Sequence, residues 1–461
     1  MKKLFGTDGI RSVAGKYPLD PPTVYTIGLA LAHSLVANTP SPRVLLGMDT
    51  RESGLSIAAQ LTSGLIAGGA SVESAGVITT PAIAHLTHTH GFAAGIVISA
   101  SHNPWQDNGI KVFGPDGYKL PDATELAIEA EIFKQLNGPG TEVGAPSSSQ
   151  KATKVGSQDA PPVNESDRAD YIRFLLAAVP NLSLDNRRII IDCANGAASA
   201  VAPELFAQIG GGEVIITHAS PDGRNINEHC GALHPEIVAA AVRHHNAAMG
   251  ITFDGDADRA LFADENGCVV NGDAVLLLAA RDLQSRNLLT NSTVVATTMS
   301  NMGLEAALKR SGIQMLRAAV GDKYVLEQML ATNAALGGEQ SGHIIFSGRS
   351  TTGDGLLTAL LLLDIVHRSG KSLSELVADL KVFPQVIVNV KVREKKPLDT
   401  IAAVAAAIAA AEKDLDGSGR VVIRYSGTEA LARVMIEAES EPLMRHHADT
   451  IANAIRAELG V

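Results

Sequence analysis

Residues 43–54 read RVLLGMDTRESG, and this stretch indicates how the chain folds. Residues 43–49 are a mostly apolar run without alternation, which is typical of a strand that is buried on both faces. Residues 50–54 are small and polar, and they suit a turn that leads from a strand into a helix. The stretch therefore predicts a strand followed at once by a helix.

The same pattern recurs further along the chain. Residues 188–192 run into Ala194-Asn195-Gly196, and residues 293–298 run into a second small, polar stretch. Buried strands that alternate with helices are typical of parallel sheets covered by helices. We therefore predict an α/β fold with three similar mixed α/β domains in series.

The end of the chain has a different pattern. Every second residue from Val386 to Val392 is valine, and this alternation indicates a strand with one exposed face in a mostly antiparallel sheet. We expect a smaller C-terminal α+β domain. Its remaining elements are predicted as a helix at 400–415, strands at 420–425 and 432–437, and a helix at 442–459.

Composition changes mark where the domains separate. Residues 138–165 are rich in Gly, Pro, Ser, Gln and Thr, which predicts an exposed connector. A length of 461 residues allows three or four domains. The predicted domains are residues 1–150, 151–256, 257–378 and 379–461.

Charge and cysteine content exclude several classes of protein. The chain has 38 Lys and Arg against 49 Asp and Glu, a net charge of −11, so we expect no nucleic-acid partner. Its 3 cysteines fit neither a disulfide framework nor a CxxC site, which favours a reducing cytoplasm. The first residues turn polar before an apolar segment forms, and no apolar run reaches the ~20 residues of a membrane span. We expect a cytoplasmic protein without a signal peptide or a membrane partner.

Asp254, Asp256 and Asp258 follow an apolar strand pattern. Three carboxylates at this spacing repel each other unless a hard cation gathers them, and Mg²⁺ prefers oxygen ligands of this kind. A solvated acidic turn is the alternative. An EF-hand is excluded because Arg259 stands where that loop requires glycine.

Ser101 and its neighbours His102 and Asn103 end another buried-strand pattern. A serine in such a turn is either a helix N-cap or a carrier of phosphate. A phosphoserine, with about −1.5 to −2 charges, would need a cation nearby, and Lys111 is a candidate. No Gly-x-Ser-x-Gly surrounds Ser101, so it is not the nucleophile of an α/β hydrolase.

Two further loops have side chains that suit a sugar phosphate. In residues 337–343 (GGEQSGH), Glu339 can accept hydrogen bonds from sugar hydroxyls and His343 can transfer a proton, although a lone histidine is more often structural. The second loop, residues 424–429, and Arg433 after it offer guanidinium and hydroxyl groups to a phosphate, with a plain surface turn as the alternative.

Taken together and in this order, these loops resemble the α-D-phosphohexomutase superfamily. The likeness begins with FGTDGIR at residues 5–11 and covers nearly the whole chain. It implies four domains around a central cleft. Gln340 makes the sugar-binding loop similar to that of the members that act on amino sugars.

The resemblance also implies roles for individual residues. Ser101 is similar to the serine that carries the phosphoryl group, with His102 and Asn103 beside it. Lys111 and His343 are the candidates for proton transfer. The implied metal ligands are Asp254, Asp256, Asp258 and a phosphoryl oxygen on Ser101. Arg11 and Arg259 are implied to add positive charge near the phosphoserine. The implied substrate-binding residues are Glu339, Ser341, Arg424, Ser426, Gly427, Thr428 and Arg433.

The resemblance implies that the protein is an isomerase. Its implied reaction interconverts glucosamine 6-phosphate and glucosamine 1-phosphate for UDP-N-acetylglucosamine synthesis. The resemblance also implies one Mg²⁺ per chain and glucosamine 1,6-bisphosphate as intermediate and activator. The nearest alternative acts on mannose or glucose phosphates by the same mechanism, and a non-catalytic protein that binds sugar phosphate or Ca²⁺ is the alternative from another class. A homodimer is compatible with the sequence.

Overall fold

The computed structural model describes residues 3–6, 8–37, 39–137, 161–425 and 430–460. Most of the predicted connector at 138–165 lies outside these residues. The chain forms two compact units, one of residues 1–298 and 316–376 and the other of residues 299–315 and 377–461. The sheets are described one by one below.

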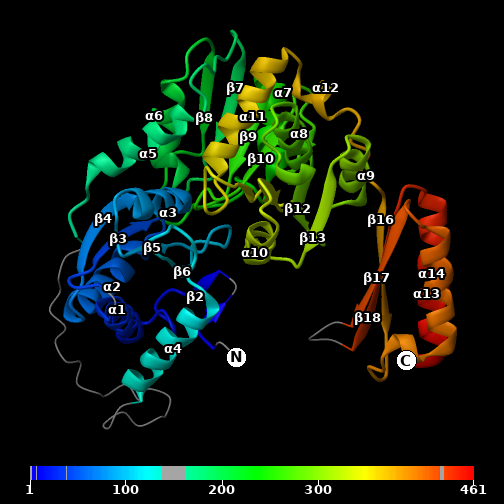
Figure 1. Cartoon of the computed structure of the whole chain (residues 1–461), viewed down its shortest axis with the longest axis horizontal. Helices are drawn as coiled ribbons and strands as arrows, with labels where there is room; N and C mark the ends of the chain where they lie inside the picture. The colour runs from blue at the N-terminus through cyan, green and yellow to red at the C-terminus, as the bar shows by residue number, and fades with distance from the viewer. Residues whose placement is uncertain (1–2, 7, 38, 138–160, 426–429, 461) are drawn as a thin grey trace. The chain divides into compact units, whose positions relative to one another are not determined.

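The N-terminal domain contains a six-stranded mixed sheet in the order β1-β2-β6-β5-β3-β4 (Figure 1). β3 is parallel to β4 and β5, whereas β6, β2 and β1 continue the sheet in antiparallel pairs. The strand predicted at 43–49 is confirmed as β3, and its residues 44–48 are buried. The elements are β1 (Phe5–Gly6), β2 (Gly9–Val13), α1 (Pro21–Val36), β3 (Arg43–Met48), α2 (Gly54–Ala67), β4 (Ser71–Val77), α3 (Thr80–Thr89), β5 (Ala94–Ile98), β6 (Asp107–Phe113) and α4 (Asp122–Leu136).

The second domain contains a five-stranded sheet in the order β11-β10-β9-β7-β8. β7 is parallel to β8 and β9, and a tight turn then reverses the chain from β9 into the antiparallel β10. The boundary predicted after residue 256 falls in this turn, and the predicted boundaries stay predictions. The elements are α5 (Glu165–Ala177), β7 (Arg188–Asp192), α6 (Ala198–Ala207), β8 (Glu213–Thr217), α7 (Pro235–His245), β9 (Met249–Phe253), β10 (Ala260–Ala263) and β11 (Val269–Val270).

The third domain contains a four-stranded sheet in the order β13-β12-β14-β15. β12 is parallel to β14, and β15 returns antiparallel to β14 after a short loop. That loop is the predicted sugar-binding loop. The elements are α8 (Gly272–Ser285), a 3₁₀ turn (Thr290–Ser292), β12 (Thr293–Thr297), α9 (Met302–Arg310), β13 (Gln314–Ala318), α10 (Asp322–Thr332), β14 (Leu336–Gly338), β15 (Ile344–Phe346), α11 (Gly355–Ser369) and α12 (Leu373–Val377).

The C-terminal domain contains a three-stranded antiparallel sheet in the order β16-β18-β17. The predicted alternation is confirmed: Val386, Val388 and Val390 pack into a core that includes residues of α13 and α14, whereas Ile387 is exposed. The elements are β16 (Gln385–Lys391), a 3₁₀ turn (Leu398–Thr400), α13 (Ala402–Asp414), β17 (Gly419–Tyr425), β18 (Leu431–Ala438) and α14 (Glu441–Leu459).

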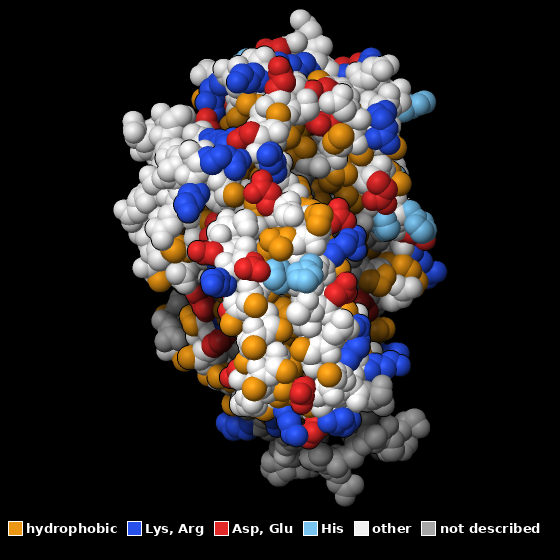
Figure 2. All heavy atoms as spheres, turned by 90° about the vertical axis from the view of Figure 1, so that its right-hand side faces the viewer, with side chains coloured by type: hydrophobic (Ala, Val, Ile, Leu, Met, Phe, Trp, Pro, Cys, Tyr) orange, Lys and Arg blue, Asp and Glu red, His pale blue; other side chains and the backbone are white. Residues whose placement is uncertain are grey.

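The exposed face of α13 and α14 carries mixed side chains. In Figure 2 hydrophobic side chains are interspersed with charged ones. Several of the exposed apolar residues are small alanines of α13, such as Ala402, Ala406 and Ala409. Single exposed apolar residues of this kind are ordinary on a protein surface.

None of the helices in the described part of the chain is long and apolar enough to cross a membrane.

Two glycines let α1 and α2 pack backbone against backbone beside the first sheet. A Cβ added to Gly28 would lie 2.3 Å from the carbonyl oxygen of Leu61, and one added to Gly64 would lie 2.1 Å from that of Tyr25. Both distances are far below van der Waals contact. The close approach of the two helices therefore requires glycine at these positions.

We expect Gly64→Ala to lower the free energy of unfolding by about 1–3 kcal/mol, because the added methyl group must push the helices apart. Urea unfolding followed by circular dichroism measures the change. Gly210→Ala is the matched control: no atom lies within 4 Å of its added Cβ, so the effect should stay within about 0.5 kcal/mol. An unfolding midpoint of Gly64→Ala equal to that of wild type would contradict this account of the packing.

Candidate active site

The Ser101 loop (residues 99–106) connects β5 to β6. Ser101 is buried, and its hydroxyl donates a hydrogen bond to Asp254 Oδ2 at 2.5 Å, across 153 residues of sequence. The element that follows the loop is a strand, so Ser101 does not cap a helix. The fold thus places Ser101, the predicted carrier of the phosphoryl group, in contact with Asp254, a predicted metal ligand.

The acidic loop between β9 and β10 is not a solvated turn. Asp254 and Asp256 are 0% exposed and Asp258 is 4% exposed. One oxygen from each carboxylate lies within 4.8 Å of the others. In the described part of the chain, Asp256 Oδ1 and Asp258 Oδ1 have no hydrogen-bond partner. Buried carboxylates that converge, with two of their oxygens left without a hydrogen-bond partner, fit a hard divalent cation such as Mg²⁺.

The electrostatics of the acidic loop agree with this fit. Burial, together with the neighbouring charges of Asp258 and Asp256, raises the pKa of Asp254 well above its usual value. Burial acts in the same direction on Asp258, but the Lys111 ammonium and His343 outweigh it and lower the pKa of Asp258. The loop does not hold three negative charges easily on its own, and a divalent cation would relieve this repulsion.

Lys111 on β6 is the buried cation of the site. Its Nζ lies 2.8 Å from Asp256 Oδ2, 3.0 Å from Asp8 Oδ2 and 3.5 Å from Asp258 Oδ2. Burial acts to lower the pKa of Lys111, but these carboxylates outweigh it and raise that pKa well above its usual value. Lys111 therefore stays charged: it can donate hydrogen bonds or a proton but cannot accept a proton.

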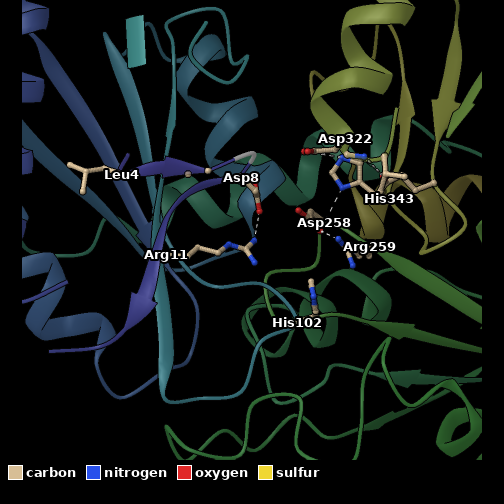
Figure 3. A pocket seen from close by; sticks show the side chains of 13 residues that line it. Leu4, Asp8, Arg11, His102, Asp258, Arg259, Asp322 and His343 are labelled. Atoms are coloured by element: carbon tan, nitrogen blue, oxygen red, sulfur yellow. Dashed lines mark hydrogen bonds and ion pairs between the residues drawn. The ribbon is translucent and has the colours of Figure 1, made fainter. Parts of the chain in front are cut away.

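A cavity of about 370 Å³ opens beside these groups. In Figure 3, Asp8 and Arg11 lie on the side of β1 and β2, and Asp258, Asp322 and His343 lie across from them. Charges of both signs therefore line the space. The lining residues are Leu4, Gly6, Asp8, Gly9, Arg11, His102, Asp258, Arg259, Val320, Gly321, Asp322, Glu339 and His343.

His343 lies buried at the wall of this cavity. Its Nδ1 is 3.6 Å from Asp258 Oδ1, and its Nε2 accepts a hydrogen bond from the backbone N–H of Gly353 at 2.9 Å. Burial acts to lower the pKa of His343, but the carboxylates of Asp258 and Asp322 outweigh it and raise that pKa. Nε2 can accept the Gly353 hydrogen bond only while it carries no proton. In this conformation the ring therefore carries a proton on Nδ1, which faces Asp258 Oδ1.

His102, next to Ser101, has a different electrostatic environment. Its Nδ1 lies 3.4 Å from Ser101 Oγ. Burial and the nearby guanidinium groups of Arg259 and Arg11 lower the pKa of His102. At neutral pH the ring is therefore uncharged and can donate or accept a hydrogen bond beside the serine.

The sugar-binding loop between β14 and β15 holds Glu339 in place. Ser341 Oγ donates to Glu339 Oε2 at 3.2 Å, and the backbone N–H of Gly321 donates to Oε1 at 3.0 Å. Gln340 instead donates to Asp273 on α8 at 3.0 Å, and it is absent from the cavity lining. The structure therefore places Glu339, and not Gln340, where a ligand in the cavity could contact it.

Four side chains of the site were not predicted from the sequence: Asp8, Thr80, Lys119 and Asp322. Lys119 bridges Asp8 and Asp322. Thr80 at the start of α3 donates to Asp256 Oδ2 at 2.6 Å. Asp8 lies inside the FGTDGIR stretch that supports the resemblance, whereas Lys119 and Thr80 have no signal in the sequence.

The second unit holds the remaining predicted residues. Arg424 on β17 lies directly opposite Arg433 on β18, so both side chains are on the sheet face that α13 and α14 do not cover. Ser426, Gly427 and Thr428 lie outside the described residues. Two guanidinium groups side by side suit an anion such as a phosphate.

Comparison with known proteins gives four consecutive family matches. Phosphoglucomutase/phosphomannomutase alpha/beta/alpha domains I, II and III match residues 2–138, 169–267 and 271–383, and the C-terminal domain of the same family matches residues 387–454. Together the matches span most of the chain.

Relatives and solved structures agree with these matches. The chain is 58% identical to a protein named phosphoglucosamine mutase from Koribacter versatilis (strain Ellin345), over 100% of this chain and 98% of the relative. It is 51% identical to one from Solibacter usitatus (strain Ellin6076), over 100% and 99% of the two chains.

Among solved structures, a phosphoglucomutase/phosphomannomutase family protein from Burkholderia thailandensis matches with a TM-score of 0.77 at 24% identity, over 100% of both chains. An N-acetylphosphoglucosamine mutase from Aspergillus fumigatus, solved with GlcNAc-6P and magnesium, matches with a TM-score of 0.59 at 20% identity, over 99% and 96% of the two chains. The four family matches and the two full-length relatives show that this chain belongs to the phosphoglucomutase/phosphomannomutase family, as its resemblance to the phosphohexomutases predicted.

Proposed function

We propose that this protein interconverts glucosamine 6-phosphate and glucosamine 1-phosphate. The observation that carries the proposal is the buried hydroxyl of Ser101, 2.5 Å from Asp254 in a group of carboxylates with unpaired oxygens. The amino sugar is supported by the relatives at 58% and 51% identity, both named phosphoglucosamine mutase.

Asp254, Asp256 and Asp258 would hold one Mg²⁺, together with an oxygen on Ser101. A cation bound there would neutralise charge on the phosphoryl group. Thr80 and Lys111 both bond to Asp256 Oδ2, so they orient this carboxylate and leave its Oδ1 without a hydrogen-bond partner. These two side chains thereby prepare the acidic loop for a metal.

The reaction takes place in two similar transfers. Phosphorylated Ser101 gives its phosphoryl group to the free hydroxyl of the sugar phosphate, which forms glucosamine 1,6-bisphosphate. The bisphosphate turns around and returns its other phosphoryl group to Ser101. Lys111, which stays protonated, stabilises the negative charge that develops on Ser101 Oγ as the P–O bond breaks.

The attacking sugar hydroxyl must lose a proton, and His343, which lines the cavity, would be the group that accepts it. Arg11, His102 and Arg259 line the cavity and would bind the oxygens of the phosphate that is being moved. Glu339 and Ser341 would accept and donate hydrogen bonds to the sugar hydroxyls.

In the second unit, Arg424, Arg433, Ser426, Gly427 and Thr428 would bind the phosphate that is not being transferred. The paired guanidinium groups on β17 and β18 support this role. We also propose the domain boundaries predicted from the sequence, a homodimer and a cytoplasmic location.

A mutase for glucose or mannose phosphates is the second candidate, because the matching family models carry those names. A coupled assay that offers glucosamine, glucose and mannose 6-phosphates separates the two. We expect the highest kcat/KM with glucosamine 6-phosphate. A higher kcat/KM with glucose or mannose 6-phosphate would reject the amino sugar as the substrate while leaving the mechanism intact.

We expect Ser101→Ala to lower kcat by about 10³-fold or more, because the change removes the hydroxyl that carries the phosphoryl group. Intact mass spectrometry after incubation with glucosamine 1,6-bisphosphate should show one phosphoryl group on wild type and none on the variant. Ser285→Ala, at an exposed position at the end of α8, is the control. Turnover of Ser101→Ala at the wild-type rate would refute the phosphoserine carrier, and a wild type that never gains phosphate would favour a non-catalytic binding protein.

A further inference from the structure

Two carbonyl oxygens of the Ser101 loop are held by the same pair of donors. The carbonyl of Ser101 accepts hydrogen bonds from Arg51 Nη2 at 3.2 Å and from Asn227 Nδ2 at 2.9 Å. The carbonyl of Asn103 accepts from Arg51 Nη2 at 2.6 Å and from Asn227 Nδ2 at 3.2 Å. Arg51 follows β3 of the first sheet, and Asn227 lies in the loop after β8 of the second. The donors therefore hold the loop from two domains.

The Ser101 loop needs such support because its backbone is strained. Ser101 has a φ of +53°, in the left-handed region that residues other than glycine, asparagine and aspartate seldom adopt. A residue in this conformation persists only where its surroundings fix it. On the first-domain side, Ser99 Oγ accepts a hydrogen bond from the backbone N–H of Ser101 and donates one to Asp49 Oδ2 at 2.5 Å.

Arg51 is itself fixed at the base of the loop. Its side chain is 0% exposed and forms an ion pair with Asp49, which is also 0% exposed. The planar guanidinium can donate in several fixed directions, and here it reaches Asp49 and the two loop carbonyls. The direction of the Ser101 side chain thus depends on a buried group that does not itself contact the cavity.

Asn227 connects the Ser101 loop to the acidic loop between β9 and β10. A Cβ added to Gly255, between Asp254 and Asp256, would lie 2.4 Å from the carbonyl oxygen of Ser101 and 2.9 Å from Asn227 Nδ2. The Asn227 amide therefore occupies the point where the two loops touch. The backbone of Asn227 is anchored by its own N–H, which donates to the carbonyl of Ala194 at 2.9 Å.

We propose that Arg51 and Asn227 are positioning residues that hold Ser101 Oγ against the acidic loop for phosphoryl transfer. This inference rests on the proposed function. Phosphoryl transfer depends on the alignment of the donor and acceptor oxygens, and misplacement by about 1 Å can cost on the order of 10²-fold in rate. The two residues act through the Ser101 backbone, so their loss should change the rate of transfer more than the binding of substrate.

Other contacts between the two domains make Asn227 suitable for a test. Thr50 Oγ1 donates to the carbonyl of Asn195 at 2.5 Å, and Arg224 pairs with Glu52 at 2.7 Å. Removal of the Asn227 amide leaves these contacts in place. We therefore expect the domains to remain associated in an Asn227 variant while the Ser101 loop loses one of its two donors.

The central variant is Asn227→Gly. Asn227 has a φ of +59°, and glycine adopts this backbone without strain, so the change removes the amide alone. Asn227→Asp is the second variant: it also tolerates the backbone but has no N–H to donate. The matched control is Asn225→Ala, because the Asn225 amide donates to Ser220 within its own loop and not to the Ser101 loop.

Steady-state kinetics with glucosamine 6-phosphate give the main measurement. We expect both Asn227 variants to lower kcat by about 10- to 100-fold with KM changed by less than about 3-fold, and Asn225→Ala to stay within about 2-fold of wild type. Wild-type kcat in both Asn227 variants, or a loss that appears mainly in KM, would overturn the positioning role. If Asn227→Gly fails to fold, Asn227→Asp decides the question.

Trp105 provides a readout that does not depend on turnover. It is the 1 tryptophan of the chain, it lies in the Ser101 loop, and the Arg224 guanidinium lies 5.1 Å from the centre of its ring. A loop released by Asn227→Gly should change the Trp105 emission, whereas Asn225→Ala should not. Unchanged emission with unchanged kcat would overturn this proposal alone, whereas a wild type without mutase activity would overturn the proposed function and this inference with it.

Discussion

The site depends on three carboxylates that the fold buries within a single tight turn. Asp254, Asp256 and Asp258 lie between β9 and β10, and among the described residues Asp256 Oδ1 and Asp258 Oδ1 accept no hydrogen bond. Such a group is unfavourable unless cations surround it. The neighbouring structure supplies Lys111 from β6 and the guanidinium of Arg259, and the remaining negative charge is what a divalent metal would neutralise.

This constraint explains why the first two domains meet where they do. Ser101 lies at the end of β5 and the acidic loop at the end of β9, and each loop ends a strand that has a parallel neighbour in its sheet. Ligands of α/β proteins bind at such strand ends, because the loops there are free to vary while the sheet stays rigid. The third sheet adds Glu339 and His343 through the short loop before β15.

Much of the fold could be predicted from the sequence because its signals are local. Buried runs such as residues 188–192 and the alternating valines of β16 identify strands through neighbours in the chain. The motifs likewise located Ser101 and the three aspartates, since each motif is short and continuous. Contacts between distant segments could not be predicted in this way, because they form only when the sheets pack together. One example is the pair of salt bridges from Lys119 to Asp8 and Asp322. Another is the pair of hydrogen bonds from Arg51 and Asn227 to the Ser101 loop.

The central claim is that one metal ion lies between the three aspartates and the oxygen of Ser101. Anomalous diffraction from crystals grown with Mn²⁺ in place of Mg²⁺ tests it most directly. The account predicts one strong peak about 2.0–2.3 Å from an oxygen of each of Asp254, Asp256 and Asp258, with a serine or phosphoserine oxygen beside it. A peak at another cluster, such as Asp192, His218 and Cys230, and none at the three aspartates would contradict the account.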